Sequence, residues 1–322
     1  MLVESARGEY TDFRIPGMVV TSEGTLLRYC ECRKGQSDWA SIDLKVARST
    51  DGGETWETVL WVMGEENTLN NPVMIADGDR VHFLYCKNYR ELYYAVSDDD
   101  GVTFCHARRV CFETSVDFFF SVVAVRPGHG IVHKGRLLVP IWFACNREDP
   151  KAHRPSRIAT LYSEDRGESW QVGESIFPER LCNPSECALA VTGADEVLIS
   201  IRHEGAEKRR GLAISADGIS AWHDLRFAET LPDPVCMGSM THDGKTVYHS
   251  NCDSEAGRVR LTVKCSEDEF RTFRARTVSD LGGYSDIALR NGKLCILYEK
   301  TVPSADGRRW GPFELFFETS EL

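Results

Sequence analysis

The chain has 322 residues, of which 42% are hydrophobic and 27% charged, and a formal net charge of -11 at pH 7. This apolar content is ample for a buried core, and the negative balance disfavours nucleic acid and anionic membrane surfaces as partners. An acidic small molecule is still allowed, because the potential inside a pocket can oppose the charge of the whole chain.

The N-terminal residues Met1 to Ser5 have neither a basic start nor the apolar run of a secretory leader, and no stretch approaches the length of a membrane span. We therefore expect a cytoplasmic location. The twelve cysteines include no Cys-x-x-Cys pair. Several of them lie in apolar, strand-like runs, where a thiol serves as a small hydrophobic group, so we expect free thiols rather than disulfides.

The first element of note is the segment Phe13-Arg14-Ile15-Pro16. An arginine inside an otherwise apolar strand must face an anion, because burying an unpaired guanidinium is expensive. Two partners are possible at this point: a carboxylate of the core, or an acidic ligand.

Short runs of β-branched and aromatic residues follow along the chain, several of them directly after Asp-Gly or Asn-Gly turns. No amphipathic helix of more than about three turns with both caps is evident. The sequence therefore predicts an all-β fold. The predicted strands include residues 18–20, 25–29, 81–85, 136–140, 196–200 and 293–298.

A Ser-x-Asp turn that closes on an aromatic residue occurs five times, at starts about fifty residues apart. Ser and Asp side chains can bond backbone groups nearby, Gly supplies a positive φ, and the aromatic residue offers apolar surface to a neighbouring unit. Three copies are nearly intact and two, the last ones, lack the glycine in place. The copies are Ser49–Trp56, Ser97–Phe104, Ser163–Trp170, Ser215–Trp222 and Ser266–Phe273.

A repeat of about fifty residues accommodates four short strands, the unit of a propeller blade. A sixth unit would combine the segment after Tyr284 with the first strands of the chain, which closes the ring without a free sheet edge. Residues 1–322 are thus predicted to form one six-bladed β-propeller domain. Seven blades remain an alternative, because the interval from Ser97 to Ser163 is long.

The Phe-Arg-Ile-Pro segment followed by repeated Asp-box turns resembles the sialidase (neuraminidase) family over essentially the whole chain. This resemblance implies an exo-acting, retaining glycosidase that removes terminal sialic acid or a related nonulosonic acid from sialylated or other acidic glycans. It implies neither a metal nor an organic cofactor.

The resemblance also implies three arginines that hold the substrate carboxylate: Arg14, Arg202 and Arg258. A planar guanidinium can pair bidentately with a carboxylate, and three such groups from separate blades could converge only on the central axis. Because the family more often has Asn where Arg260 stands, Arg260 is an alternative to Arg258, and strand alternation predicts that both face the same side.

The catalytic residues implied by the resemblance are Asp38, Tyr284 and Glu186. Asp38 matches the acid/base aspartate, and Arg33 matches the arginine that precedes it and would contact substrate. Tyr284 matches the nucleophile, and Glu186 its proton-accepting partner. A neutral phenol avoids the repulsion that a carboxylate nucleophile would meet beside the acid group of the sugar.

Two further carboxylates, two tryptophans and one loop are expected to support or surround the site. Glu299 is expected to support an arginine from behind, and Asp43 to be structural. Trp39 and Trp142 are either pocket-lining residues or core tryptophans, and the charged, proline-containing loop Asn146–Ser156 is expected to overhang the pocket.

Two histidines four residues apart, His129 and His133, could suggest a metal site. His129 and His133 lack the glutamate of a zinc-protease helix and are not expected to bind metal.

Two alternative functions are open. The first alternative function is a lyase or hydrolase acting on uronic-acid glycans. The second is a non-catalytic propeller that binds acidic glycans.

Overall fold

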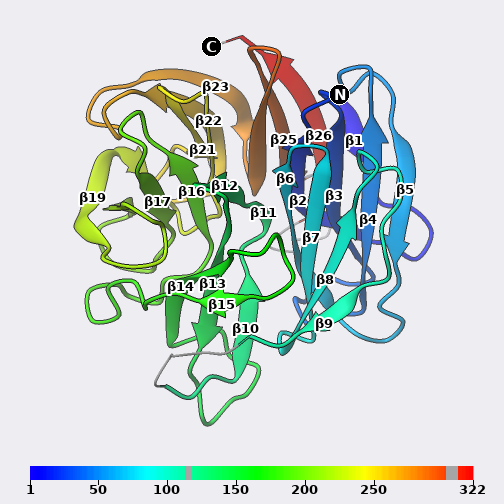
Figure 1. The fold of residues 1–322 in the computed structure, drawn as a ribbon, viewed down its shortest axis with the longest axis horizontal. Coiled ribbons are helices and arrows are strands. Elements are labelled where there is room, and N and C mark those ends of the chain that lie inside the picture. The colour runs from blue at the N-terminus through cyan, green and yellow to red at the C-terminus, as the bar shows by residue number, and fades with distance from the viewer. Residues whose placement is uncertain (113–117, 302–310, 322) are drawn as a thin grey trace.

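The computed structural model describes residues 1–112, 118–301 and 311–321, which form six small sheets arranged around a central axis (Figure 1). Every predicted strand run listed above coincides with an observed strand, although the runs 25–29 and 196–200 begin one residue before it, and the described residues contain no helix. No element of the described chain could therefore cross a membrane as a helix. The predictions of an all-β fold and of six blades are confirmed.

Each blade runs outward from an innermost strand at the axis, and neighbouring blades touch through these inner strands. Blade 1 comprises β2 (Asp12–Val20), β3 (Leu26–Arg33), β4 (Ile42–Ser49) and β5 (Glu57–Val62). Blade 2 comprises β6 (Leu69–Asp77), β7 (Arg80–Lys87), β8 (Glu91–Ser97) and β9 (Arg108–Val110), with β11 (Gly128–His129) parallel to β6. Blade 3 comprises β10 (Val122–Val125), β12 (Ile131–His133), β13 (Arg136–Ala144), β14 (Ser156–Ser163) and β15 (Gln171–Val172).

The remaining blades have four strands each. Blade 4 comprises β16 (Cys187–Val191), β17 (Val197–Ile201), β18 (Arg209–Ser215) and β19 (His223–Pro232). Blade 5 comprises β20 (Ser239–His242), β21 (Val247–Cys252), β22 (Val259–Ser266) and β23 (Arg274–Leu281). Blade 6 comprises β24 (Ser285–Arg290), β25 (Lys293–Thr301), β26 (Phe313–Ser320) and β1 (Leu2–Glu4).

The ring closes where β1 pairs with β26, with Leu2 opposite Phe316 and Glu4 opposite Leu315. The N-terminal strand thus completes the C-terminal blade, as predicted, and β2 already belongs to blade 1. The long interval between the second and third Asp-box turns does not hold a seventh blade. In this interval the innermost strand of blade 3 is divided into β10 and β12, and β11 adds to blade 2 beside β6.

All five Asp-box turns follow the third strand of a blade. In the first copy, Gly53 N donates to Ser49 Oγ at 2.8 Å, and Thr55 N donates to the Asp51 carboxylate at 3.0 Å. Gly53 has a φ of +91°, and a Cβ added there would lie 2.2 Å from a ring carbon of Phe317 in blade 6. Glycine is therefore required here both for its backbone conformation and for the close approach of two blades.

The fifth copy keeps the same turn without glycine. Phe270 stands in the glycine place with a φ of +66°, and its N–H donates to Ser266 Oγ at 2.8 Å. This conformation is strained for a bulky residue. The ring is only 2% exposed and packs in an apolar cluster that includes Leu198 and Leu212 of blade 4. Burial of the ring offsets the backbone strain.

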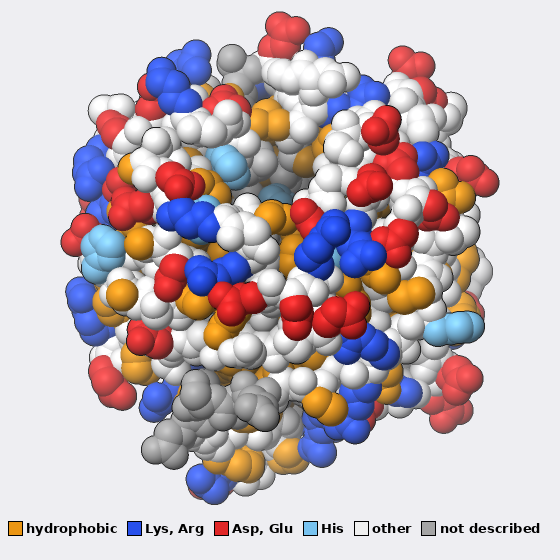
Figure 2. Space-filling model, in the orientation of Figure 1, with side chains coloured by type: hydrophobic (Ala, Val, Ile, Leu, Met, Phe, Trp, Pro, Cys, Tyr) orange, Lys and Arg blue, Asp and Glu red, His pale blue; other side chains and the backbone are white. Residues whose placement is uncertain are grey.

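The Asp-box turns mark one end of the propeller, and the starts of the innermost strands lie at the other. The predicted functional residues Glu186 and Tyr284 directly precede β16 and β24, so they lie at the end opposite the Asp-box turns. On the face drawn in Figure 2, acidic and basic side chains are interspersed around a central hollow.

Candidate active site

One cavity at the axis is lined by residues from all six blades. Its free space is about 830 Å³ including the part open to solvent, which is in the range of small-molecule sites. The structure brings all seven predicted site residues into this cavity: Arg14, Arg33, Asp38, Glu186, Arg202, Arg258 and Tyr284.

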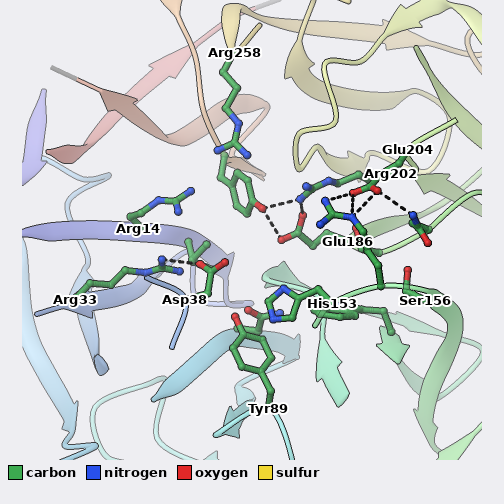
Figure 3. Close-up of a pocket in the computed structure, with 17 residues that line it drawn as sticks. Arg14, Arg33, Asp38, Tyr89, His153, Ser156, Glu186, Arg202, Glu204 and Arg258 are labelled. Carbon is green, nitrogen blue, oxygen red and sulfur yellow. Dashed lines mark hydrogen bonds and ion pairs between the residues drawn. The ribbon is translucent and has the colours of Figure 1, made fainter. Parts of the chain in front are cut away.

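The three predicted carboxylate-binding arginines come from blades 1, 4 and 5 and extend from different sides toward the same space (Figure 3). The guanidinium carbons of Arg14 and Arg258 lie 5.3 Å and 5.2 Å from the centre of the Tyr284 ring. Arg202 Nη1 donates to Tyr284 Oη at 2.8 Å. Within the described residues, the buried Nε atoms of Arg14 and Arg202 have no hydrogen-bond partner. An anion in the cavity would lie beside guanidinium groups whose hydrogen-bonding capacity the protein does not fill.

Arg14 is held by Glu299 on β25, a carboxylate with no exposed surface. Glu299 Oε2 accepts from Arg14 Nη2 at 3.3 Å and from Tyr284 N at 3.2 Å, while Oε1 accepts from Ile15 N at 2.8 Å. Ile15 has a φ of +57°, which is rare for a β-branched residue. One buried carboxylate therefore fixes the first arginine, the strained residue beside it and the backbone of the tyrosine.

Arg258 and Arg260 do not face the same side, contrary to the expectation from strand alternation. Arg258 precedes β22 and lines the cavity, whereas the Arg260 side chain is 60% exposed and pairs with Asp253 at 3.0 Å. The physical reason is local: Arg260 has a φ of +53°, and the pairing of β22 with β23 shifts register just after it. A residue in the left-handed region breaks the alternation of an extended strand.

Tyr284 lies at the centre of a hydrogen-bonded group. Its Oη donates to Glu186 Oε1 at 2.6 Å, and Glu186 Oε2 pairs with Arg202 Nη1. Burial raises the pKa of the Tyr284 phenol far above its ordinary value, and Glu186 adds to the shift, while Arg202 opposes it. The free protein thus holds a neutral phenol with its proton already directed at a carboxylate.

Asp38 lies across the cavity from Glu186, in the loop after β3 (Figure 3). Arg33 Nη1 donates to Asp38 Oδ1 at 2.8 Å, while Arg33 Nη2 pairs with the buried Glu31 at 2.6 Å. The Asp38 side chain is 47% exposed. Partial desolvation raises its pKa, but the guanidinium groups of Arg33 and Arg14 outweigh this effect and hold the pKa below its ordinary value. Arg33 therefore positions and ionises Asp38.

The wall opposite Arg14 and Arg258 contains two residues that the sequence did not single out, His153 and Tyr89. His153 lies among Tyr89, Trp142 and Trp39, with ring-centre distances of 4.9, 5.2 and 6.1 Å. Burial lowers its pKa below the ordinary value, so the ring is neutral at pH 7. Within the described chain, His153 Nε2 and Trp142 Nε1 are buried without a partner. An isolated histidine in a polar loop carries no signal that would identify it as a wall residue.

The loop Asn146–Ser156 does reach over the cavity, as expected, and contributes His153, Arg154 and Ser156 to its lining. Arg154 pairs with Glu204 of blade 4, and Asn183 Nδ2 donates to Glu204 Oε2 at 3.0 Å. These bonds tie the loop of blade 3 to blade 4 at the cavity rim.

The contacts of Trp142, Trp39 and Asp43 show which role each side chain has in the fold. Trp142 lines the cavity. Trp39 is not part of the lining and packs against the ring of Tyr89, with 4.9 Å between the ring centres. Asp43 is fully buried and accepts hydrogen bonds from Tyr10 Oη and Gly64 N, so it is structural.

The two histidines that were considered as metal ligands lie apart from this cavity. His129 bonds Asp286 at 2.8 Å, and His133 bonds Asp195 at 3.2 Å. Across the described ranges, no group of three His, Cys, Asp or Glu side chains is arranged to hold a metal ion.

The chain matches one family model and is similar to several curated proteins. A family model described as a BNR repeat-like domain matches residues 40–296. A sialidase of Bacteroides fragilis is 26% identical over 90% of this chain and 60% of its own length. A sialidase of Micromonospora viridifaciens is 25% identical over 98% of this chain and 53% of its own length. The chain thus spans somewhat more than half the length of these two relatives.

Solved structures show the same fold. The Hadza microbial sialidase Hz136 superposes with a TM-score of 0.78 at 23% identity, covering 98% of this chain and 66% of the other. Trypanosoma rangeli sialidase in complex with 2,3-difluorosialic acid, described as a covalent intermediate, gives a TM-score of 0.75 at 19% identity. That match covers 96% of this chain and 54% of the other.

Proposed function

Because the chain belongs to the family of BNR repeat-like domains and matches sialidases over most of its length, we propose that it is an exo-acting sialidase. It would be a retaining glycoside hydrolase that releases terminal sialic acid, or a related nonulosonic acid, from a glycan. The observation that carries this proposal is the placement of the Tyr284 phenol against Glu186, with three arginines grouped around the same ring.

The arginines would select and orient the substrate. A sugar carboxylate placed between Arg14, Arg202 and Arg258 would meet donors from three blades, and each charge-assisted hydrogen bond contributes roughly 1.5–3 kcal/mol. The carboxylate would lie over the Tyr284 side chain, since the guanidinium groups of Arg14 and Arg258 do so. The adjacent anomeric carbon would then lie within reach of the phenol oxygen.

Tyr284 would act as nucleophile with Glu186 as its base. As the phenol oxygen attacks the anomeric carbon, its proton passes along the existing 2.6 Å hydrogen bond to Glu186. The phenol is neutral until that moment, so it does not repel the carboxylate of the sugar. Arg202 Nη1, at 2.8 Å from Tyr284 Oη, stabilises negative charge that develops on the oxygen.

Asp38 would serve as general acid and then as general base. In the first step it protonates the departing glycosidic oxygen, and in the second it takes a proton from the attacking water. Two displacements at the same carbon return the starting configuration, so the reaction retains stereochemistry. The low pKa of Asp38 in the free protein is due partly to Arg14. A bound carboxylate neutralises Arg14, which raises the pKa of Asp38 when a proton donor is needed.

Hydrolysis of a fluorogenic aryl α-sialoside tests the proposal, with Tyr284→Phe as the disabling variant. Loss of the nucleophile is expected to lower kcat by about 10³-fold or more. Tyr298→Phe is the matched control, because Tyr298 is also a buried blade 6 tyrosine but lies outside the cavity lining. A wild-type protein inert toward sialosides and related nonulosonates would refute the proposal. Release of an unsaturated product would instead indicate a lyase.

A further inference from the structure

Glu31 is a buried carboxylate directly behind the arginine that pairs with Asp38. It lies on β3 two residues before Arg33, so the two side chains leave the strand on the same face. The Glu31 side chain has no exposed surface and does not belong to the cavity lining. Glu31 therefore does not touch a ligand in the cavity, and it can act on the reaction only through the residues that it holds.

Both oxygens of Glu31 face hydrogen-bond donors. Oε2 accepts from Arg33 Nε at 2.8 Å and lies 2.6 Å from Arg33 Nη2, while Oε1 accepts from Asn71 N at 2.8 Å. A proton on either oxygen would displace one of these donors, so the geometry fits an ionised carboxylate. Burial raises the pKa of Glu31 above its ordinary value, and Arg33 and the Asn71 N–H oppose that shift.

The guanidinium group of Arg33 is shared between two carboxylates. Nε and Nη2 face Glu31, which leaves Nη1 to donate to Asp38 Oδ1 at 2.8 Å. The Arg33 side chain is only 1% exposed, so its charge is compensated by the two carboxylates rather than by water. A planar guanidinium held through two of its nitrogens cannot turn freely, and Glu31 thereby fixes the direction in which Nη1 points.

The same carboxylate holds a part of the cavity wall that belongs to blade 2. Asn71 on β6 lines the cavity and has a φ of +54°. Its Nδ2 donates to the carbonyl oxygen of Val125 in blade 3 at 2.8 Å, and its N–H donates to Glu31 in blade 1. Glu31 thus fixes the position of Arg33 relative to the wall of the neighbouring blade.

Charged and titratable groups act on Asp38 from four parts of the chain. They are Arg14 on β2, Glu31 and Arg33 on β3, Tyr89 between β7 and β8, and His153 in the loop before β14. After burial, the negative charge of Asp38 also contributes to the raised pKa of Glu31. Since the repulsion of two like charges is mutual, Glu31 favours the protonated form of Asp38.

We propose that Glu31 is a positioning residue for the acid/base step, an inference that rests on the function proposed above. It holds Arg33 so that Nη1 aligns the Asp38 carboxyl group, and it offsets the charge of Arg33 so that Asp38 can carry a proton. When the glycosidic bond breaks, the departing oxygen takes the bonding electron pair and this proton, and it leaves as a hydroxyl group. When water attacks the intermediate, one of its protons returns to Asp38. Glu31 exchanges no proton in either step.

Glu31→Gln in the full chain removes the charge and keeps the size of the side chain. Arg33 then acts on Asp38 without compensation, which lowers the pKa of Asp38. A general acid works below its pKa, so the loss on the basic side of the pH profile begins at lower pH. For a sialoside of a sugar hydroxyl, the basic limb of kcat is expected to move down by about 0.5 pH unit or more. On the same substrate, kcat at pH 7 should fall about tenfold or more, with KM within about threefold of wild type.

The leaving group separates the acid step from general damage to the site. An aryl sialoside needs little protonation of its leaving oxygen, so Glu31→Gln is expected to lose less than about threefold in single-turnover formation of the intermediate on that substrate. Equal losses on both substrates would contradict the inference. Glu31→Asp restores the charge on a shorter side chain. Its basic limb is expected at the wild-type pH, while its kcat on the sugar sialoside stays about threefold or more below wild type.

Glu4→Gln is the matched control. Glu4 is also a buried carboxylate, and it pairs with Arg28 of the same strand β3 at 2.8 Å, but neither residue lines the cavity. This variant is expected to lose stability, seen as a lower Tm, and to keep the basic limb of the wild type. If Glu31→Gln does not fold, Glu31→Asp carries the test through its loss of kcat on the sugar sialoside.

Two further results would overturn the inference: a basic limb of Glu31→Gln that stays at the wild-type pH, or a wild-type kcat of Glu31→Asp on the sugar sialoside. A crystal structure of Glu31→Gln needs no sialoside and tests the positioning by itself. Arg33 is expected to turn toward Asp38 and to bind both of its oxygens, and an Arg33 in unchanged position would contradict the inference. A failure of the proposed function would be recognised separately, as absence of turnover by the wild type.

Discussion

The Tyr284 phenol and the Glu186 carboxylate are joined by a hydrogen bond of 2.6 Å across the hub of the propeller. Tyr284 directly precedes β24 of blade 6, and Glu186 directly precedes β16 of blade 4, 98 residues earlier in the chain. The two groups meet because both innermost strands start at the same end of the ring. Proton transfer between them requires no rearrangement of the protein.

Replacement of Asp38 should affect substrates according to their leaving group. Asp38→Asn removes the proposed proton donor, and general acid catalysis is worth about 10²–10⁴-fold. A sialoside of an ordinary sugar hydroxyl should lose kcat on that scale, because its leaving oxygen is strongly basic. An aryl sialoside, whose phenolate leaves readily, should lose much less in the step that forms the intermediate. Equal losses on both substrates in single-turnover measurements would argue against Asp38 as the acid.

The pH profile should differ between kcat and kcat/KM. A general acid loses activity as pH rises through its pKa, and the pKa of Asp38 in the free protein is held low by Arg33 and Arg14. In the complex, the substrate carboxylate cancels part of this positive charge, so the pKa rises. The basic limb of kcat is therefore expected at higher pH than that of kcat/KM. Coincident limbs, measured with a substrate for which chemistry limits the rate, would contradict this coupling.

Arg258 and Arg260 provide a matched pair only two residues apart. Arg258→Ala removes a cavity guanidinium and should raise KM or lower kcat/KM by roughly 10–100-fold, the equivalent of one or two charge-assisted hydrogen bonds. Arg260→Ala removes an exposed pair with Asp253 and should change kcat/KM by less than about twofold. A larger effect at Arg260 than at Arg258 would show that the bound state differs from the structure.

The fifth Asp-box turn allows a test of strain against burial. Phe270→Gly relieves a backbone strain of about 1–3 kcal/mol but removes a fully packed ring, a loss of about 3–5 kcal/mol. The net expectation is a destabilisation of about 2 kcal/mol, seen as a lower urea midpoint. Gly53→Ala is the comparison, because it introduces strain and a clash with Phe317 at the intact first turn. A more stable Phe270→Gly protein would show that strain outweighs burial.

The fold could be predicted because its signals are periodic. Asp-box turns recur after each third strand, and each reports one blade through residues near in sequence, such as Ser49 and Gly53. The blade count was less certain from spacing alone, since β11 and the division of one innermost strand into β10 and β12 lengthen one interval without adding a blade.

The lining of the candidate site could be predicted where a motif marks it and not elsewhere. Arg14 and Tyr284 stand in recognisable segments, and both line the cavity. Strand alternation failed at Arg260 because a positive φ is a property of the folded backbone. His153 and Glu204 reach the cavity through loops whose path depends on tertiary contacts with blades 2 to 4. Single-sequence patterns do not encode such contacts.

In the proposed mechanism, Tyr284 forms a covalent bond to the anomeric carbon of an acidic sugar held by three arginines. Incubation with 2,3-difluorosialic acid, followed by peptide mapping, tests it most directly, because the fluorine at C3 slows breakdown of a glycosyl intermediate. One fluorosialyl group is expected on the peptide containing Tyr284, formed by the wild type and Asp38→Asn but absent in Tyr284→Phe. An adduct on another residue, or turnover of sialosides that persists in Tyr284→Phe at the wild-type rate, would contradict it.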